Sequence, residues 1–116
     1  TSRHQLLARS VHKARRVEKP NPLTPDELDV VLQRLPGWTA ENNRIAKDYE
    51  FKDFLDSLGF VSRLAPYFEQ KDHHPDVHIY YNRVRFELSR YDMGGKITDR
   101  DIEVAKLIEH EYARIT

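Results

Sequence analysis

Apolar residues recur with the period of an amphipathic helix within residues 24–35, 53–70 and 98–115. Thr24 stands at the start of the first segment and Thr98 at the start of the third, and both are typical helix caps. The pattern therefore predicts three helices. Their expected inward faces are Leu28, Val31, Leu32 and Leu35; Phe54, Leu55, Leu58, Val61, Leu64, Ala65 and Phe68; and Ile102, Ala105, Ile108, Tyr112 and Ile115.

Shorter segments between the predicted helices have the composition and alternation of strands. Residues 38–41 and 44–51 predict one hairpin, and residues 77–81 and 83–88 predict a second one that turns at Asn82. The element order is then αββαββα. We predict an α+β fold in which a four-stranded antiparallel sheet carries its helices on one face. Such a sheet leaves open edges, which favour self-association.

The composition is that of a single water-soluble domain. The chain has 116 residues, of which 39% are hydrophobic and 33% charged, and these proportions are typical of a globular protein. No apolar run reaches the roughly eighteen residues of a membrane span. The absence of cysteine excludes disulfides, thiolate zinc sites and a cysteine nucleophile. We expect a cytoplasmic protein without a membrane segment.

The formal net charge of zero hides a segregation of charge. Residues 1–20 contain six basic residues and one acidic residue, so they carry +5 and the remainder carries −5. We divide the chain into a basic N-terminal arm, residues 1–22, and a domain, residues 23–116. The arm is open to interpretation as a solvated tail, a transit-peptide remnant, a nucleic-acid or membrane contact, or a docking segment for an acidic protein or a neighbouring subunit. Of these, we do not favour nucleic acid or membrane.

Residues 69–75, which read Glu-Gln-Lys-Asp-His-His-Pro, are the strongest candidate for chemistry because they place His73 and His74 between carboxylates and a proline. Imidazole has an unperturbed pKa of about 6.5, so a fixed pair is suited to proton transfer near neutral pH. Pro75 cannot continue a helix and places the pair at an element boundary. The simpler alternative is that the histidines only close a helix C-terminus, where a positive ring complements the macrodipole.

A zinc site is a weaker interpretation of the same region. His73, His74 and His78 are potential ligands, but Pro75 breaks the helical register that would bring His74 and His78 together. We therefore expect no metal.

A set of polar and aromatic positions resembles the signature of the pterin-4a-carbinolamine dehydratases: Glu69, His73, His74, Pro75, Tyr81 and Asp101. The resemblance covers residues 24–112 and includes the stretches Asp-His-His-Pro, Tyr-Asn-Arg-Val and Gly-Gly-Lys-Ile-Thr-Asp-Arg-Asp. It implies an αββαββα domain that forms a homodimer or homotetramer. It also implies dehydration of 4a-hydroxytetrahydropterin to quinonoid dihydropterin in tetrahydrobiopterin recycling. Some members of this family also serve as dimerisation partners of a transcription factor.

Carried over position by position, the resemblance implies catalytic roles for three residues: His73, His74 and Tyr91. It implies substrate-binding roles for four more: Glu69, Asp72, Pro75 and Tyr81. The reaction needs one proton delivered to the C4a hydroxyl as it leaves and one removed from N5 of the pterin. Imidazoles can do both in turn, so no metal or cofactor is required.

The chain departs from the family pattern at Tyr91, which aligns with the third active-site histidine. A phenol, with a pKa of about 10, can donate a hydrogen bond to the leaving oxygen but is a poor proton shuttle at neutral pH. One hypothesis is a dehydratase weakened at this position. The other is a dehydratase-like scaffold that binds protein, similar to relatives that assist Rubisco assembly in carboxysomes, and such a protein would be carboxysome-associated or organellar.

Overall fold

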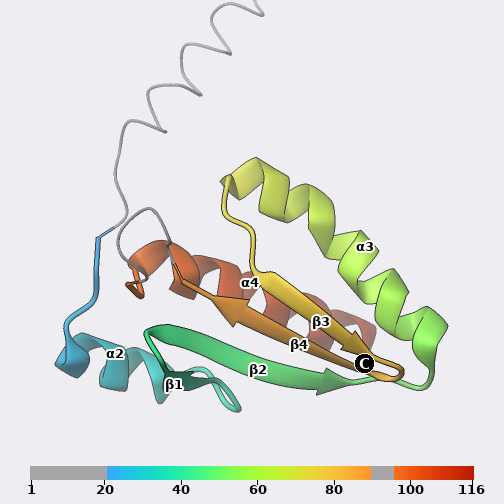
Figure 1. Ribbon diagram of the computed structural model, residues 1–116, viewed down its shortest axis with the longest axis horizontal. Helices are drawn as coiled ribbons and strands as arrows, with labels where there is room; N and C mark the ends of the chain where they lie inside the picture. Colours follow the sequence, from blue (N-terminus) through green and yellow to red (C-terminus); the bar gives the residue numbers. More distant parts are fainter. Residues whose placement is uncertain (1–20, 90–95) are drawn as a thin grey trace, which may run out of the picture.

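The computed structural model describes residues 21–89 and 96–116, so residues 1–20 of the basic arm and Tyr91 lie outside the described residues. Helices and strands follow in the predicted order (Figure 1): α2 (Pro25–Leu32), β1 (Thr39–Glu41), β2 (Arg44–Glu50), α3 (Phe54–Lys71), β3 (Asp76–Tyr80), β4 (Arg83–Leu88) and α4 (Asp99–Ile115). In the described part of the chain, no helix is long and apolar enough to cross a bilayer.

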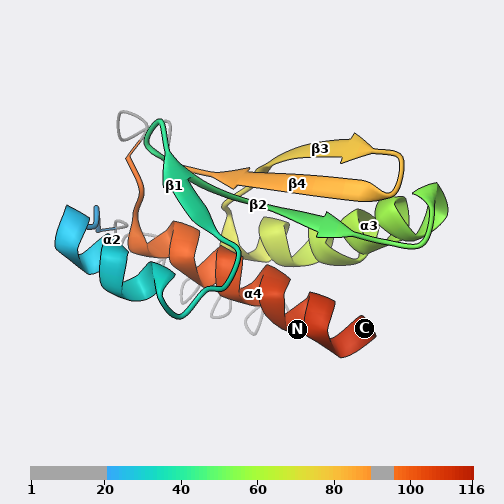
Figure 2. The same cartoon turned by 90° about the horizontal axis from the view of Figure 1, so that it is seen from below.

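The strands form one antiparallel sheet in the order β1-β2-β4-β3. Figure 2 shows α2, α3 and α4 on the same side of this sheet, which confirms the predicted α+β architecture. Along β4, the buried residues Val84, Phe86 and Leu88 alternate with half-buried charged ones. The opposite face of the sheet carries ion pairs instead, such as that of Arg83 with Asp48 at 2.5 Å.

Local sequence signals start the helices and turn the first hairpin as expected. Thr24 begins α2 and Thr98 begins α4, each as part of a capping box. Asn42 and Asn43 both have positive φ, 54° and 61°, which is the left-handed conformation that a two-residue hairpin turn needs and that asparagine tolerates. Helix α2 ends earlier than predicted, and Leu35 is buried in the turn that follows it.

Aromatic rings at the sheet–helix interface form the centre of the core. Tyr49 of β2 lies 5.9 Å from Phe60 of α3 and 5.9 Å from Phe86 of β4, measured between ring centroids. Phe60 and Phe86 are 6.0 Å apart in an edge-to-face arrangement. These separations lie in the range in which aromatic pairs attract each other, so α3 is fixed across the two central strands.

Helix α3 buries a narrower face than the sequence predicted. Its buried positions form a single stripe: Ser57, Phe60, Leu64 and Phe68. The prediction missed Phe60 and was wrong for Ala65 and for three large residues that are exposed: Phe54, Leu55 and Leu58. The apolar residues of α3 cover two adjoining sides of the helix, and only one side meets the core. Ile115 of α4, also predicted inward, is 37% exposed at the helix end.

A polar cluster joins α4 to the first hairpin. The carboxylate of Glu109 accepts hydrogen bonds from the Lys47 ammonium at 2.5 Å, from the Trp38 indole at 3.3 Å and from the Tyr49 hydroxyl. Burial and the neighbouring carboxylate raise the pKa of Tyr49, so its hydroxyl remains a donor. Gly37 has a φ of 86°, and a side chain there would collide with Lys47. The carboxylate of Glu109 therefore holds the first hairpin, β1 and β2, to helix α4.

Substituting Glu109 with Gln is expected to lower the stability of the fold by about 1–3 kcal/mol at pH 7, because Lys47 loses its ion pair in a half-buried site. Burial alone would raise the pKa of Glu109, but the hydrogen bonds from Lys47 and Tyr49 outweigh it and lower the pKa below 4.5. The ionised form therefore stabilises the fold above the unfolded pKa, and this contribution is lost as the pH falls through the folded pKa. Denaturant melts of both proteins should differ at pH 7 and converge in acid; equal stability at pH 7 would contradict the role of Glu109.

Asn21 is hydrogen-bonded to the start of helix α4. Its backbone N–H donates to Asp99 Oδ1 at 3.0 Å, and its carbonyl accepts from the Asp99 N–H at 2.9 Å. Pro22 forms an isolated β-bridge with Thr98. Two residues that we assigned to the arm thus contact the start of α4, and the boundary between residues 22 and 23 stays a prediction.

Candidate active site

The turn that follows α3, residues 72–75, places the two histidines in different environments, and we call it the histidine turn. Asp72 adopts the left-handed conformation, with a φ of 53°, and the N–H of His73 reaches back to the carbonyl of Phe68 at 3.1 Å. This is a common way to end a helix and satisfy its last carbonyls. The chain then runs through Pro75 into β3. As a result His73 is buried, at 4% exposure, while 53% of the His74 side chain is exposed.

Asp101 of α4 holds the ring of His73. Its Oδ1 is hydrogen-bonded to His73 Nε2, and its Oδ2 accepts the backbone N–H of Thr98 at 2.8 Å. Asp101 is fully buried, so each oxygen needs a partner to offset its desolvation. The same carboxylate therefore starts α4 and orients the imidazole.

Glu69 holds the ring of His74 at the surface. It lies on the last turn of α3, and its Oε2 is 2.5 Å from His74 Nε2. Both members of this pair are largely exposed, so the contact orients the ring without enclosing it. Solvent and a small molecule have access to the His74 ring.

The partners of the two rings determine which nitrogen carries the proton. An ionised carboxylate only accepts hydrogen bonds, so Nε2 is the protonated nitrogen of neutral His73 and of neutral His74. The other ring nitrogen, Nδ1, is then a base in the neutral ring and an acid in the imidazolium ring. Two imidazoles oriented in this way are suited to general acid–base catalysis.

The remaining predicted site residues divide into two groups. Asp72 and Pro75 flank the histidines, one as the left-handed helix end and the other as the lead into β3. Tyr81 lies in the turn beyond the far end of β3, with a φ of 54° and 66% exposure. A five-residue strand spans about 16 Å, so within one chain Tyr81 does not join the histidines. Tyr91 lies outside the described residues.

Two neighbours of the histidines had no site role in the sequence prediction. Asp101 was predicted as part of a helix start and of the family signature, but nothing in its spacing indicates that it contacts His73. Arg100 donates from Nη1 to the carbonyl of Lys71 at 3.3 Å. The sequence signal for both is the run of three charged residues, Asp99 to Asp101, that follows the cap of α4. This run does not show which element the side chains would contact.

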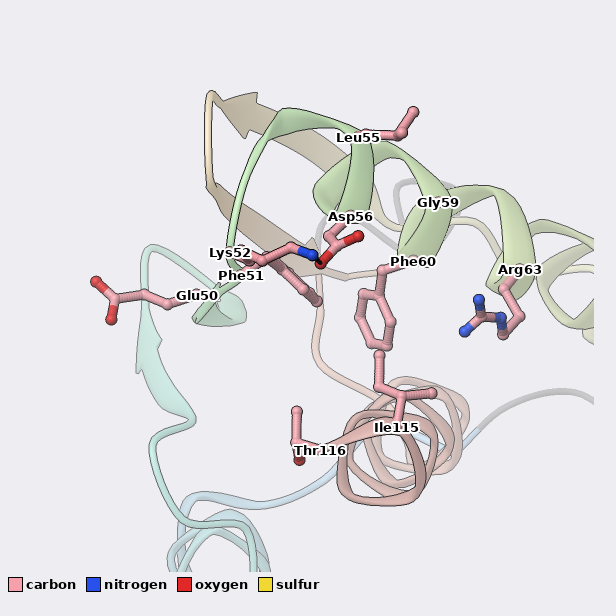
Figure 3. A pocket seen from close by; sticks show the side chains of 10 residues that line it. All are labelled: Glu50, Phe51, Lys52, Leu55, Asp56, Gly59, Phe60, Arg63, Ile115 and Thr116. Atoms are coloured by element: carbon pink, nitrogen blue, oxygen red, sulfur yellow. Dashed lines mark ion pairs between the residues drawn. The ribbon is translucent and has the colours of Figure 1, made fainter.

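A separate cavity of about 470 Å³ lies between the first half of α3 and the end of α4 (Figure 3). Phe60 and Ile115 form part of its wall, and Arg63 points into it. Gly59 also lines it, and a Cβ atom at that position would meet nothing within 4 Å. The histidines follow the opposite end of α3, so this cavity is not their site.

Comparison with known proteins identifies the family. A family model described as pterin 4 alpha carbinolamine dehydratase matches residues 21–111. A relative from Sulfolobus acidocaldarius is 43% identical over 86 residues, which cover 74% of this chain and 93% of the relative. One from Thermosynechococcus vestitus is 44% identical over 88 residues, which cover 76% and 92%. Both are provisionally named pterin-4-alpha-carbinolamine dehydratase.

A solved structure shares the fold. The crystal structure of a transcriptional coactivator/pterin dehydratase from Brucella melitensis matches 78% of this chain and 98% of its own, with a TM-score of 0.73 and 33% identity. The family match spans both His73 and Asp101. The chain therefore belongs to the pterin-4a-carbinolamine dehydratase family.

Proposed function

We propose that the chain dehydrates 4a-hydroxytetrahydropterin to quinonoid dihydropterin, the reaction for which its family is named. The observation that carries this proposal is the pair of adjacent imidazoles, each oriented by its own carboxylate. Because the two rings differ in exposure, we assign them different roles. The exposed ring of His74 contacts the substrate, and the buried ring of His73 anchors the backbone next to His74.

In the proposed mechanism His74 transfers both protons. Its imidazolium form donates the Nδ1 proton to the C4a hydroxyl, and water leaves as the C4a–O bond breaks. The lone pair of N5 forms the new C4a=N5 double bond. Neutral His74 then accepts the proton from N5, and the ring returns to its starting state. Glu69 stabilises the positive ring through its charge.

The other residues of the site have supporting roles in the proposal. Tyr91 donates a hydrogen bond to the leaving oxygen at the position where the family has a histidine. Asp72 and Pro75 shape the substrate side of the histidine turn. Tyr81 was also assigned to pterin binding by the resemblance, and its position at the far end of β3 separates it from His74 in the same chain.

The direct test is a dehydration assay on freshly generated 4a-carbinolamine. The rate should exceed the uncatalysed rate and increase in proportion to protein concentration. A rate equal to the background at every protein concentration would overturn the proposed activity.

We propose protein binding as a second function, with the basic arm as the contact element. It is supported by the +5 charge of residues 1–20 and by the Brucella melitensis neighbour, whose description pairs a coactivator with a pterin dehydratase. The partner would be an acidic protein, such as an assembly client or a regulator. Segregated charge of this kind gives long-range attraction that salt weakens.

Deleting residues 1–20 is expected to leave the melting temperature and the oligomeric state nearly unchanged, because segregated surface charge contributes little to the folding of its own domain. Binding of an acidic protein partner should be lost, and binding by the full chain should weaken steeply as salt is raised. Pull-downs with both chains, followed by thermal melts and sedimentation, test this. Equal capture by the truncated chain, or its unfolding, would contradict the role of the arm.

We also propose that the chain associates with copies of itself. Large apolar side chains are exposed on α3: Phe54, Leu55 and Leu58 near its start, and Tyr67 near its end. Strand β3 is an edge of the sheet, and open edges and apolar patches are surfaces on which subunits assemble. We therefore propose a homodimer or homotetramer, in keeping with the proposal of a cytoplasmic enzyme.

A further inference from the structure

The end of α3 is held by a side chain of α4 as well as by its own backbone. Arg100, in the first turn of α4, donates from Nη1 to the carbonyl oxygen of Lys71 at 3.3 Å. Lys71 is the last residue of α3, and the last four carbonyls of a helix have no intrahelical donor. Arg100 therefore supplies a hydrogen bond that the helix cannot supply itself, and its positive charge lies at the negative end of the helix.

Glu103 orients this arginine and ties it to the same turn. Its Oε1 lies 3.8 Å from Arg100 Nε and 3.7 Å from Lys71 Nζ. The carboxylate thus bridges a residue of each helix. Only 22% of the Arg100 side chain is exposed, so the guanidinium is fixed between α3 and α4 rather than free in solvent.

We propose that Arg100 is a positioning residue of the site, which fixes the helix end that carries the proton-transferring His74 and its carboxylate partner Glu69. Glu69 precedes Lys71 by two residues, and His74 follows it by three. Of the two histidine rings, Asp101 contacts only that of His73. Arg100 instead bonds the backbone of the segment that carries Glu69 and His74. The inference rests on the proposed dehydratase activity, because it assigns a role within that reaction.

A shift of the helix end by about 1 Å would misalign His74 with the substrate, and such displacements can cost up to about 10²-fold in rate. Arg100→Ala is therefore expected to lower kcat by about 10- to 100-fold with a smaller change in KM. Arg100→Lys keeps one donor and the charge, so it should restore most of the rate. Arg114→Ala is the matched control, because Arg114 is also on α4 and pairs with a glutamate, Glu111, but lies near the other end of the helix.

Amide hydrogen exchange gives a readout that does not depend on turnover. The amides of Asp72 and His73 donate to carbonyls within the last turn of α3, and their exchange should become at least about tenfold faster in Arg100→Ala and remain unchanged in Arg114→Ala. Unchanged exchange, or a kcat that falls no more than in Arg114→Ala, would overturn the proposal. If the wild-type chain itself fails to dehydrate the carbinolamine, the proposed function fails, and exchange alone then decides whether Arg100 holds this turn.

Discussion

Replacement of His74 with alanine is expected to lower the rate of carbinolamine dehydration by about 10²- to 10⁴-fold, the usual cost of losing a positioned acid or base. The fold should persist with little change in stability. The His74 side chain is 53% exposed and its partner Glu69 is 75% exposed, and exposed pairs of this kind contribute at most about 1 kcal/mol.

His78→Ala provides the control for this experiment. His78 is also an exposed histidine near a carboxylate, since its Nε2 lies 3.6 Å from Glu87 Oε1, but it is on β3 and outside the histidine turn. The dehydration rate of His78→Ala should stay within about twofold of the wild-type rate, because most surface substitutions away from the core, helix caps and buried networks have small effects. Steady-state rates and thermal melts of the three proteins are the measurement. Equal activity of the two variants would refute the proposed role of His74.

Replacement of Asp101 with alanine is expected to destabilise the fold by about 2–4 kcal/mol, because a capping interaction and a buried hydrogen bond are lost together. The Thr98 N–H and the His73 ring would both lose the acceptor that this buried carboxylate provides. For a domain of about 100 residues, each kcal/mol lowers the melting temperature by about 4–8 °C. Activity should fall in parallel, since His73 is no longer oriented.

Two further variants separate the contributions of Asp101. Asp99→Ala removes the neighbouring half-buried carboxylate, which bonds to Asn21, and should cost no more than about 1 kcal/mol. Asp101→Asn keeps the shape but removes the charge, so it should retain more stability than Asp101→Ala while losing about 10- to 100-fold in rate through poorer ring orientation. If denaturant melts show the same loss of unfolding free energy for Asp101→Ala and Asp99→Ala, the burial of the Asp101 carboxylate does not contribute to stability.

Much of the architecture could be predicted from the sequence because its signals are local. Paired asparagines at residues 42 and 43 specify a hairpin turn, and Thr24 and Thr98 specify helix starts. The strict alternation in β4 specified its buried face. Such features depend on a few neighbouring residues, and the layer arrangement then follows from burying the apolar faces.

The failures of prediction involve contacts between elements. The apolar residues of α3 are too numerous for a single buried face, and periodicity alone does not show which side meets the core, so Leu55 and Leu58 were wrongly assigned. The importance of the histidine turn was visible in residue types and family signature. The difference in burial between His73 and His74 was not, because it depends on the left-handed conformation of Asp72 and on Asp101 from a distant helix.

The contact between His73 and Asp101 joins residues that are 28 positions apart, and this separation bears on the order in which the chain folds. Each hairpin closes over a two-residue turn, between Glu41 and Arg44 and between Tyr80 and Arg83. Such local contacts cost little loop entropy and form in microseconds, whereas contacts between distant segments form later. The candidate site is therefore completed only when α3 and α4 come together, after the two local hairpins can form. Recovery of activity during refolding would report this non-local step, and a partly folded chain with native hairpins alone would carry no assembled site.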